Sequence, residues 1–213
     1  MSVSIWLSFL GISLVTAFSP GPAILLAMSN AASRGVGKAL LSSAGNALGI
    51  FLVSGAAMIG LGTLLRTSFM LFTALKIVGA AYLVYLGVKQ WRGAGKAAPA
   101  TASQPEPAAA PSASAAQLFR DGLLVALTNP KSIIFFTALF PQFIQPGEAI
   151  LPQFCVLTFT FVGCALLSHT TFVLLARGAG ARLKAGKRLR VLQRTSGALF
   201  MSLGVALLAV KRA

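Results

Sequence analysis

Six long apolar runs, separated by short polar or basic segments, dominate the chain. Each run is at least as long as the roughly 20 predominantly apolar residues that a helix needs to cross the hydrocarbon core of a bilayer. The runs cover residues 5–28, 39–65, 67–91, 122–144, 149–176 and 191–210. The pattern predicts an all-α membrane protein with six transmembrane helices.

Two of these runs contain a break, at residues 19–22 (Ser-Pro-Gly-Pro) and at 129–131 (Asn-Pro-Lys). Proline has no N–H to donate, and its ring collides with the carbonyl four residues earlier. The three prolines should therefore free the carbonyls of Thr16, Phe18 and Ala126. An unpaired backbone group costs several kcal/mol in hydrocarbon, so a break persists only where protein, water or a solute meets it. A single break would favour a packing kink, whereas two matched breaks favour a transporter's substrate site.

The two breaks lie at equivalent points of two halves. A shift of 110 residues places Pro20 on Pro130 and Ala39 on Ala149. The halves, residues 1–92 and 118–213, each hold three runs, and an odd number of crossings per half gives them opposite orientations. Between them, residues 93–117 are mostly Ala, Pro and Ser, which predicts a flexible linker. We therefore expect two inverted three-helix repeats in which the first and fourth helices are broken.

The positive charge of the chain is a topology signal. Only 10% of the residues are charged, against about 25% in soluble domains, yet the formal net charge is +15. The basic residues lie mainly in loops and are not interleaved with aromatic residues, which argues against nucleic-acid binding. Thirteen lie in loops one, three and five, and three lie on the opposite side. The positive-inside rule then places both termini outside the cytoplasm.

A few polar side chains fall inside the apolar runs, and each has two explanations. Lys131 either binds a ligand or faces a water-filled vestibule. Lys76 either lines the transport path or extends its ammonium to the interface. His169 titrates in the range needed for proton coupling, or it only forms a hydrogen bond. Asn46 and Asn129 need polar partners in lipid, and Asn129 alternatively caps the second half-helix.

The sequence resembles the LysE/RhtB amino-acid exporters of bacterial inner membranes, over essentially the whole chain except the linker. The resemblance implies export of amino acids or close relatives, driven by the proton gradient across the lipid bilayer, with no cofactor. A homodimer is compatible with these features. The motifs that carry the resemblance are residues 19–22, 34–35, 45, 49, 76, 79–83, 86–87, 122, 127, 129–131 and 140–143.

An amino acid is a zwitterion, and a broken helix offers a partner for each of its charges. The N-terminus of a half-helix suits the carboxylate, and freed carbonyls suit the ammonium group. We therefore predict a substrate site and, beside it, two residues on the coupling route or the transport pathway. The predicted substrate-binding residues are Ser19, Pro20, Gly21, Pro22, Asn46, Asn129, Pro130 and Lys131, and the two others are Lys76 and His169.

The expected substrate is a neutral amino acid such as threonine, homoserine or a branched-chain amino acid. A second positive charge would need a buried carboxylate, but Glu106, Asp121 and Glu148 lie in loops or at the edge of a run. In the family's branch for basic amino acids, acidic residues occupy places that correspond here to Asn46 and Phe135. Their replacement suits a small neutral or aliphatic side chain.

Other functions fit the sequence less well. An exporter of a metal or another toxic ion is disfavoured, because one histidine, two cysteines and no buried carboxylate make a poor cation site. A membrane thiol redox protein would need Cys155 and Cys164 to meet, but nine residues apart on a helix they lie on opposite faces. A structural scaffold would not need broken helices. The chain also lacks the phosphate-binding and nucleophile motifs of enzymes.

Overall fold

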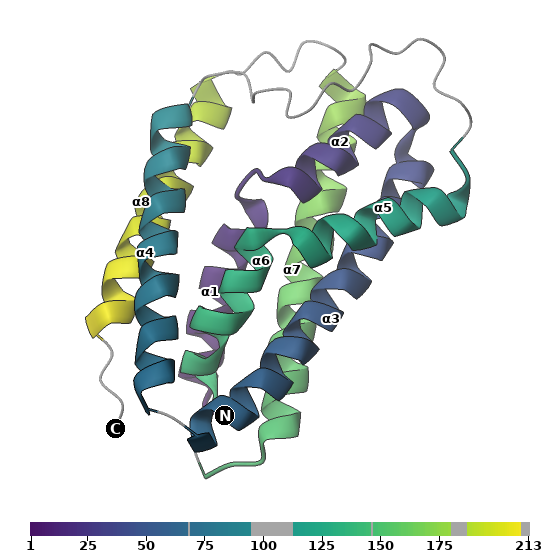
Figure 1. The fold of residues 1–213 in the computed structure, drawn as a ribbon. Helices are drawn as coiled ribbons and strands as arrows, with labels where there is room; N and C mark the ends of the chain where they lie inside the picture. Colours follow the sequence, from purple (N-terminus) through teal and green to yellow (C-terminus); the bar gives the residue numbers. More distant parts are fainter. Residues whose placement is uncertain (68, 95–112, 146, 180–186, 210–213) are drawn as a thin grey trace.

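The computed structural model describes residues 1–67, 69–94, 113–145, 147–179 and 187–209, and within these ranges it consists of helices and short connections (Figure 1). The helices, in order, are α1 (Val3–Phe18), α2 (Pro22–Arg34), α3 (Val36–Thr67), α4 (Phe69–Gly93), α5 (Ala115–Thr128), α6 (Pro130–Ile134), the π-helix η1 (Phe135–Leu139), the 3-10 helix η2 (Phe140–Phe143), α7 (Ile150–Ala179) and α8 (Lys187–Ala209). The all-α prediction is confirmed for these residues.

The first apolar run is broken where the prolines predict it. Helix α1 ends at Phe18, Ser19 is extended, and α2 begins at Pro22 after a bend of 53°. Proline suits the first position of a helix, because the missing N–H would have no partner there. Helix α2 ends at Arg34 and is followed by Gly35 as its C-cap, with a φ of 89° that glycine adopts at no steric cost. Helix α3 begins at the next residue.

The fourth run is broken at Asn129, where α5 and the segment that begins with α6 meet at a bend of 50°. This run was predicted to begin at residue 122, but α5 begins at Ala115, inside the predicted linker. The Ser114 hydroxyl accepts a hydrogen bond from the Gln117 N–H at 3.2 Å, which caps the helix there. Most of the predicted linker, residues 95–112, lies outside the described residues.

Small residues allow the helices to approach closely, among them Gly45 and Gly49, whose spacing of four is typical of close helix contacts. Helix α3 packs against α5, and a Cβ added at Gly45 would come within 1.9 Å of the Phe119 carbonyl oxygen. From the other side, a Cβ at Gly122 would come within 1.8 Å of the Ser42 carbonyl oxygen. Helix α4 packs against α8 in the same way, through Gly87 among others. These contacts fix α5, and with it the second break.

Two described helices are long and apolar enough to cross a membrane alone, at Val36–Gly60 in α3 and Ile150–Arg177 in α7. Each bent pair would add one crossing if it counts as a single span, which gives up to four in the described residues. The predicted third and sixth spans are helical, as α4 and α8, but they are not among these candidates.

The largest buried cluster is aromatic and lies between α1, the segment from η1 to η2, and α7. Phe9 contacts Phe135, Phe140 and Phe143 with ring centroids 5.1–6.0 Å apart. Tilted and edge-on ring pairs of this kind pack stably. The cluster separates the region of the breaks from the end of the molecule that holds the N-terminus.

Candidate functional site

Both breaks border one small buried cavity. Its volume is about 30 Å³, room for about one water molecule and too little for an amino acid. The walls come from α1, α2, α3, α6, α7 and the second break. The polar or glycine residues that line it include Thr16, Gly21, Asn46, Asn129, Lys131 and His169.

The first break is closed by a side chain from the other half of the protein. The Lys131 ammonium donates hydrogen bonds to the carbonyl oxygens of Thr16 at 3.0 Å and Ser19 at 2.8 Å. Pro20 leaves the Thr16 carbonyl without its helical N–H partner, as predicted. Close by, the Ser168 hydroxyl of α7 donates to the carbonyl of Ala17 at 2.8 Å. The carbonyls at the end of α1 are thus paired with side chains of α6 and α7.

The second break is closed by its own residues. The Asn129 N–H donates to the Ala126 carbonyl at 3.3 Å, so the carbonyl that Pro130 should free has a local partner. The Asn129 side-chain oxygen accepts from the Lys131 N–H at 3.1 Å, and the Asn129 carbonyl accepts from the Ile133 N–H at 3.1 Å. Asn129 therefore caps both helices that meet there, which confirms the capping explanation.

A larger cavity of about 840 Å³ lies beside the small one and shares Gly21, Asn129 and Lys131 with it. We call it the vestibule. Its wall also includes the remaining residues of the first break and Gly93 at the end of α4, so it lies toward the end of the molecule where α4 finishes (Figure 1). Because Lys131 borders both cavities, its side chain stands between them.

None of the described residues that line the two cavities is acidic. Lys131 forms no ion pair with the described residues, and carbonyl dipoles are its hydrogen-bond partners. The ammonium group lies next to Gly21, where an added Cβ would be 3.4 Å from Nζ, an ordinary van der Waals contact. The region between the breaks is thus a pocket of backbone carbonyls and one cation.

His169 is buried and faces the small cavity from α7. Its Nδ1 lies 3.2 Å from the Ser43 hydroxyl oxygen, and the same hydroxyl lies 3.1 Å from the Ala39 carbonyl oxygen. A serine hydroxyl has one proton, so it can donate either to that carbonyl or to Nδ1. Which ring nitrogen of His169 carries the proton depends on that choice.

Of the other residues named from the sequence, Phe135, Cys155 and Cys164 are not among the residues that line the small cavity. The side chain of Lys76 lies outside the described part of the structure. Phe135 is buried behind the cavity wall, with its ring centroid 4.5 Å from that of Phe161, which does line the cavity. Cys155 and Cys164 are free thiols on α7. The described residues hold no group of three or more His, Cys, Asp or Glu side chains that could bind a metal ion.

Sequence reasoning missed three polar side chains of the site: those of Ser43, Ser168 and Gln90. The amide of Gln90 donates to the Ser19 hydroxyl at 2.6 Å and so ties α4 to the first break. Thr16 was named for its carbonyl, but its buried hydroxyl has no hydrogen-bond partner and its residue lines the cavity. A search for small polar residues in the apolar runs would have drawn attention to the serines.

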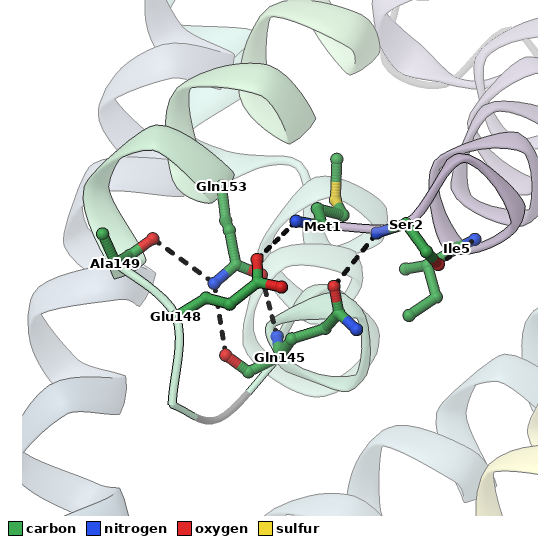
Figure 2. A network of polar contacts seen from close by, with 7 residues as sticks. All are labelled: Met1, Ser2, Ile5, Gln145, Glu148, Ala149 and Gln153. Carbon is green, nitrogen blue, oxygen red and sulfur yellow. Dashed lines mark hydrogen bonds and ion pairs between the residues drawn. The ribbon is translucent and has the colours of Figure 1, made fainter.

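The end of the molecule that holds the N-terminus is closed by polar contacts (Figure 2). The N-terminal ammonium pairs with Glu148, and the Ser2 N–H donates to the Gln145 side chain at 3.1 Å. The Gln153 side-chain oxygen in turn accepts from the Gln145 N–H at 2.8 Å, and its amide nitrogen donates to the Gln145 carbonyl at 3.2 Å. Together with the aromatic cluster, this network joins the start of α1 to the connection between η2 and α7.

Comparison with known proteins decides the family. Residues 14–211 match the family described as LysE type translocator. The chain belongs to the LysE family. This confirms the resemblance that the two breaks indicated, and with the apolar helices it makes the chain a membrane protein that crosses the bilayer more than once.

Several curated proteins are similar to this LysE family member. The homoserine/homoserine lactone efflux protein of Salmonella typhimurium is 36% identical over 215 residues, which cover all of both chains. A membrane protein of Vibrio cholerae is 35% identical over 99% of this chain and all of its own length. The leucine efflux protein of Salmonella choleraesuis is 31% identical over 70% of this chain and 74% of its own. No solved structure matches the chain significantly.

Proposed function

We propose that this protein is a secondary transporter of the bacterial inner membrane that exports neutral amino acids or close relatives. The observation that carries the proposal is the pairing of an ammonium group with the carbonyls of Thr16 and Ser19, beside a cavity bordered by both breaks. A broken helix at the interface of two repeats is where secondary transporters bind substrate. The N-terminus of α2, with Gly21, Ala23 and Ile24 on the cavity wall, suits the carboxylate.

The described residues around both cavities carry no acidic side chain, which supports a neutral substrate. A cationic side chain would need a carboxylate to offset its desolvation, and Lys131 would repel it in a low dielectric. The relatives named for efflux of homoserine and of leucine also handle uncharged side chains. Threonine, homoserine and branched-chain amino acids are therefore the proposed substrates.

The architecture that we propose is six spans in two inverted repeats, residues 1–92 and 118–213, joined by the linker. In support, helices of one half pack against helices of the other: α1 packs on α7, and α5 packs on α3. We propose further that both termini lie in the periplasm. A periplasm-active reporter fused after Ala213 should be active, and one fused within residues 100–116 should be silent; the reverse pattern would overturn the orientation.

We propose that export is coupled to protons through His169, the chain's single histidine, because its side chain is buried and lines the cavity that both breaks border. Asparagine can form a hydrogen bond with Ser43 as donor or acceptor but offers no titratable group. His169→Asn should therefore retain substrate binding while transport no longer responds to an imposed pH gradient. A variant that still responds would exclude His169 as the coupling group.

The direct test is uptake into everted membrane vesicles, where export appears as accumulation. Labelled homoserine, threonine, leucine and lysine are compared between vesicles with the protein and vesicles without it. Accumulation of the neutral amino acids supports the proposal, whereas accumulation of lysine alone contradicts it. Asn46→Asp is the informative variant, because a carboxylate on the cavity wall should add lysine to the substrates.

A further inference from the structure

The Lys131 ammonium occupies the place where a substrate's amino group would bind. Its two acceptors, the carbonyls of Thr16 and Ser19, belong to the first break and lie 3.0 and 2.8 Å from Nζ. Pro20 deprives the Thr16 carbonyl of its helical partner, and Ser19 is extended, with ψ of 116°, so its carbonyl leaves the helical direction. This pair of carbonyls is a binding site for a primary ammonium group, and a lysine from the other half of the protein fills it.

The lysine side chain and the amino group of an amino acid present the same chemistry to this site. Each ammonium group has three N–H donors and a positive charge, with no acceptor of its own. Two ammonium groups cannot share the carbonyls, because like charges at this distance repel strongly in a low dielectric. The small cavity, at about 30 Å³, has no room for a substrate while Lys131 holds its present position.

We infer that Lys131 is an internal competitor that substrate must displace: the primary ammonium of the substrate takes the carbonyls of Thr16 and Ser19, and the lysine turns away. The inference rests on the proposed function and names the group that the site recognises. Lys131 borders both the small cavity and the vestibule, so its side chain can leave the carbonyls for either space. Once displaced, its charge is free to pair with a substrate carboxylate where there is one.

A primary ammonium is then the required feature of a substrate, and a carboxylate is an optional one. The name of the Salmonella typhimurium relative joins homoserine with its lactone; the two molecules share the amino group, but the lactone has no free carboxylate. A molecule without an ammonium group has nothing with which to displace Lys131. The lysine therefore keeps the site filled when no substrate is present.

The test uses ethylammonium, the smallest probe that carries the recognised group and no carboxylate. Its affinity is measured by calorimetry on the purified full chain in lipid nanodiscs. Lys131→Met removes the competitor, so the affinity for ethylammonium should be at least about tenfold higher than in the wild type. This is the gain expected when charge-assisted hydrogen bonds form without a competing ammonium group. Lys38→Met, which removes an exposed lysine of α3, is the matched control and should leave the affinity unchanged.

If Lys131→Met binds ethylammonium no more tightly than the wild type, Lys131 is not a competitor and the inference is wrong. Pro20→Ala supplies the opposite test and is compatible with helix formation. Added to Lys131→Met, its new N–H can bond the Thr16 carbonyl with no lysine competing for it, so ethylammonium should bind more weakly than to Lys131→Met alone; unchanged affinity would also contradict the inference. Lys131→Gln, neutral and shorter, replaces the methionine variant if that variant does not fold.

The outcomes separate this inference from the proposed function. Tighter binding to Lys131→Met in a protein whose vesicles accumulate no amino acid would keep the ammonium site and reject the exporter. Accumulation of neutral amino acids with no change of ethylammonium affinity would keep the exporter and reject the competitor. Homoserine lactone gives a further contrast with homoserine, because only the latter loses a carboxylate partner in Lys131→Met.

Discussion

The two breaks have similar sequences, but their hydrogen bonds have different sources. At the first break, the carbonyls of Thr16, Ala17 and Ser19 are bound by the side chains of Lys131 and Ser168. At the second break, Asn129 bonds the neighbouring turns through its N–H, its carbonyl and its side chain. One break depends on tertiary contacts, and the other closes itself.

This difference assigns a separate role to each break. A break that is closed by distant side chains opens whenever those side chains move, so it can accept a ligand. A break that closes itself is a fixed turn, and it holds Lys131 at the start of α6 in a constant position. We therefore propose that the first break receives the ligand (the receptive break) and that the second holds Lys131 in place (the mount).

The largest difference in export is expected between the variants Pro20→Ala and Pro130→Ala. An N–H at residue 20 can bond the Thr16 carbonyl, which then no longer accepts from an ammonium group. A hydrogen bond to a charged group contributes about 1.5–3 kcal/mol, so export by Pro20→Ala should fall about tenfold or more. Pro130→Ala offers an N–H to the Ala126 carbonyl, which Asn129 already serves, and its export should fall by less than about threefold.

The measurement is accumulation in everted vesicles, normalised to the amount of protein in the membrane. Neither variant should reduce that amount, because each restores a helical hydrogen bond. Equal losses of export in the two variants would remove the distinction between the breaks. Full export by both would reduce them to packing kinks.

Asn129→Ala tests whether the second break holds Lys131 in place, and its effect on export should be intermediate. Loss of an N-cap costs about 1 kcal/mol, enough to populate misplaced positions of Lys131 and lower export about fivefold. Asn129→Ser keeps an oxygen for the Lys131 N–H and is the matched control, with export near that of the wild type. If both variants export equally, the side-chain cap does not position the lysine.

Ser168→Ala removes a hydrogen bond at the first break and should have a smaller effect on export. The Ala17 carbonyl loses a hydrogen bond with a net contribution of about 1 kcal/mol, but Lys131 still holds its two neighbours, so export should fall about two- to threefold. Thr171→Ala is the control on the same helix, because that hydroxyl bonds the Leu167 carbonyl within α7. A larger loss than in Asn129→Ala would make Ser168 part of the site itself.

Local rules of the backbone predicted the breaks, but not what closes them. The missing N–H of Pro20 is enough to identify the Thr16 carbonyl as free, and Gly45 with Gly49 is enough to predict a close helix contact. The partner of that carbonyl, Lys131, lies 115 residues away, and its reach depends on the packing of α2, α5 and α6. No periodicity or spacing contains that information.

Other features were missed for similar reasons. The start of α5 lies in an Ala- and Ser-rich stretch where helix and linker share a composition, and only the cap by Ser114 distinguishes them. The π-helix Phe135–Leu139 has no recognisable sequence signal. It packs against α4, where a Cβ at Gly79 would come within 2.1 Å of the Ala138 Cβ. Such a contact is a property of two helices together.

A shortened linker should have the smallest effect of all, and it tests whether the contact between the breaks depends on the connection between the halves. Lys131 reaches the first break because α2, α3, α5 and α7 pack together, and a chain of Ala, Pro and Ser adds no large apolar side chain to that packing. Doubling a flexible loop changes its closure free energy by only about 0.6 kcal/mol, so deletion of residues 101–106 should change it less. Export and ethylammonium affinity should both match the wild type. A loss larger than that of Ser168→Ala would mean that the linker helps to hold the two halves in register.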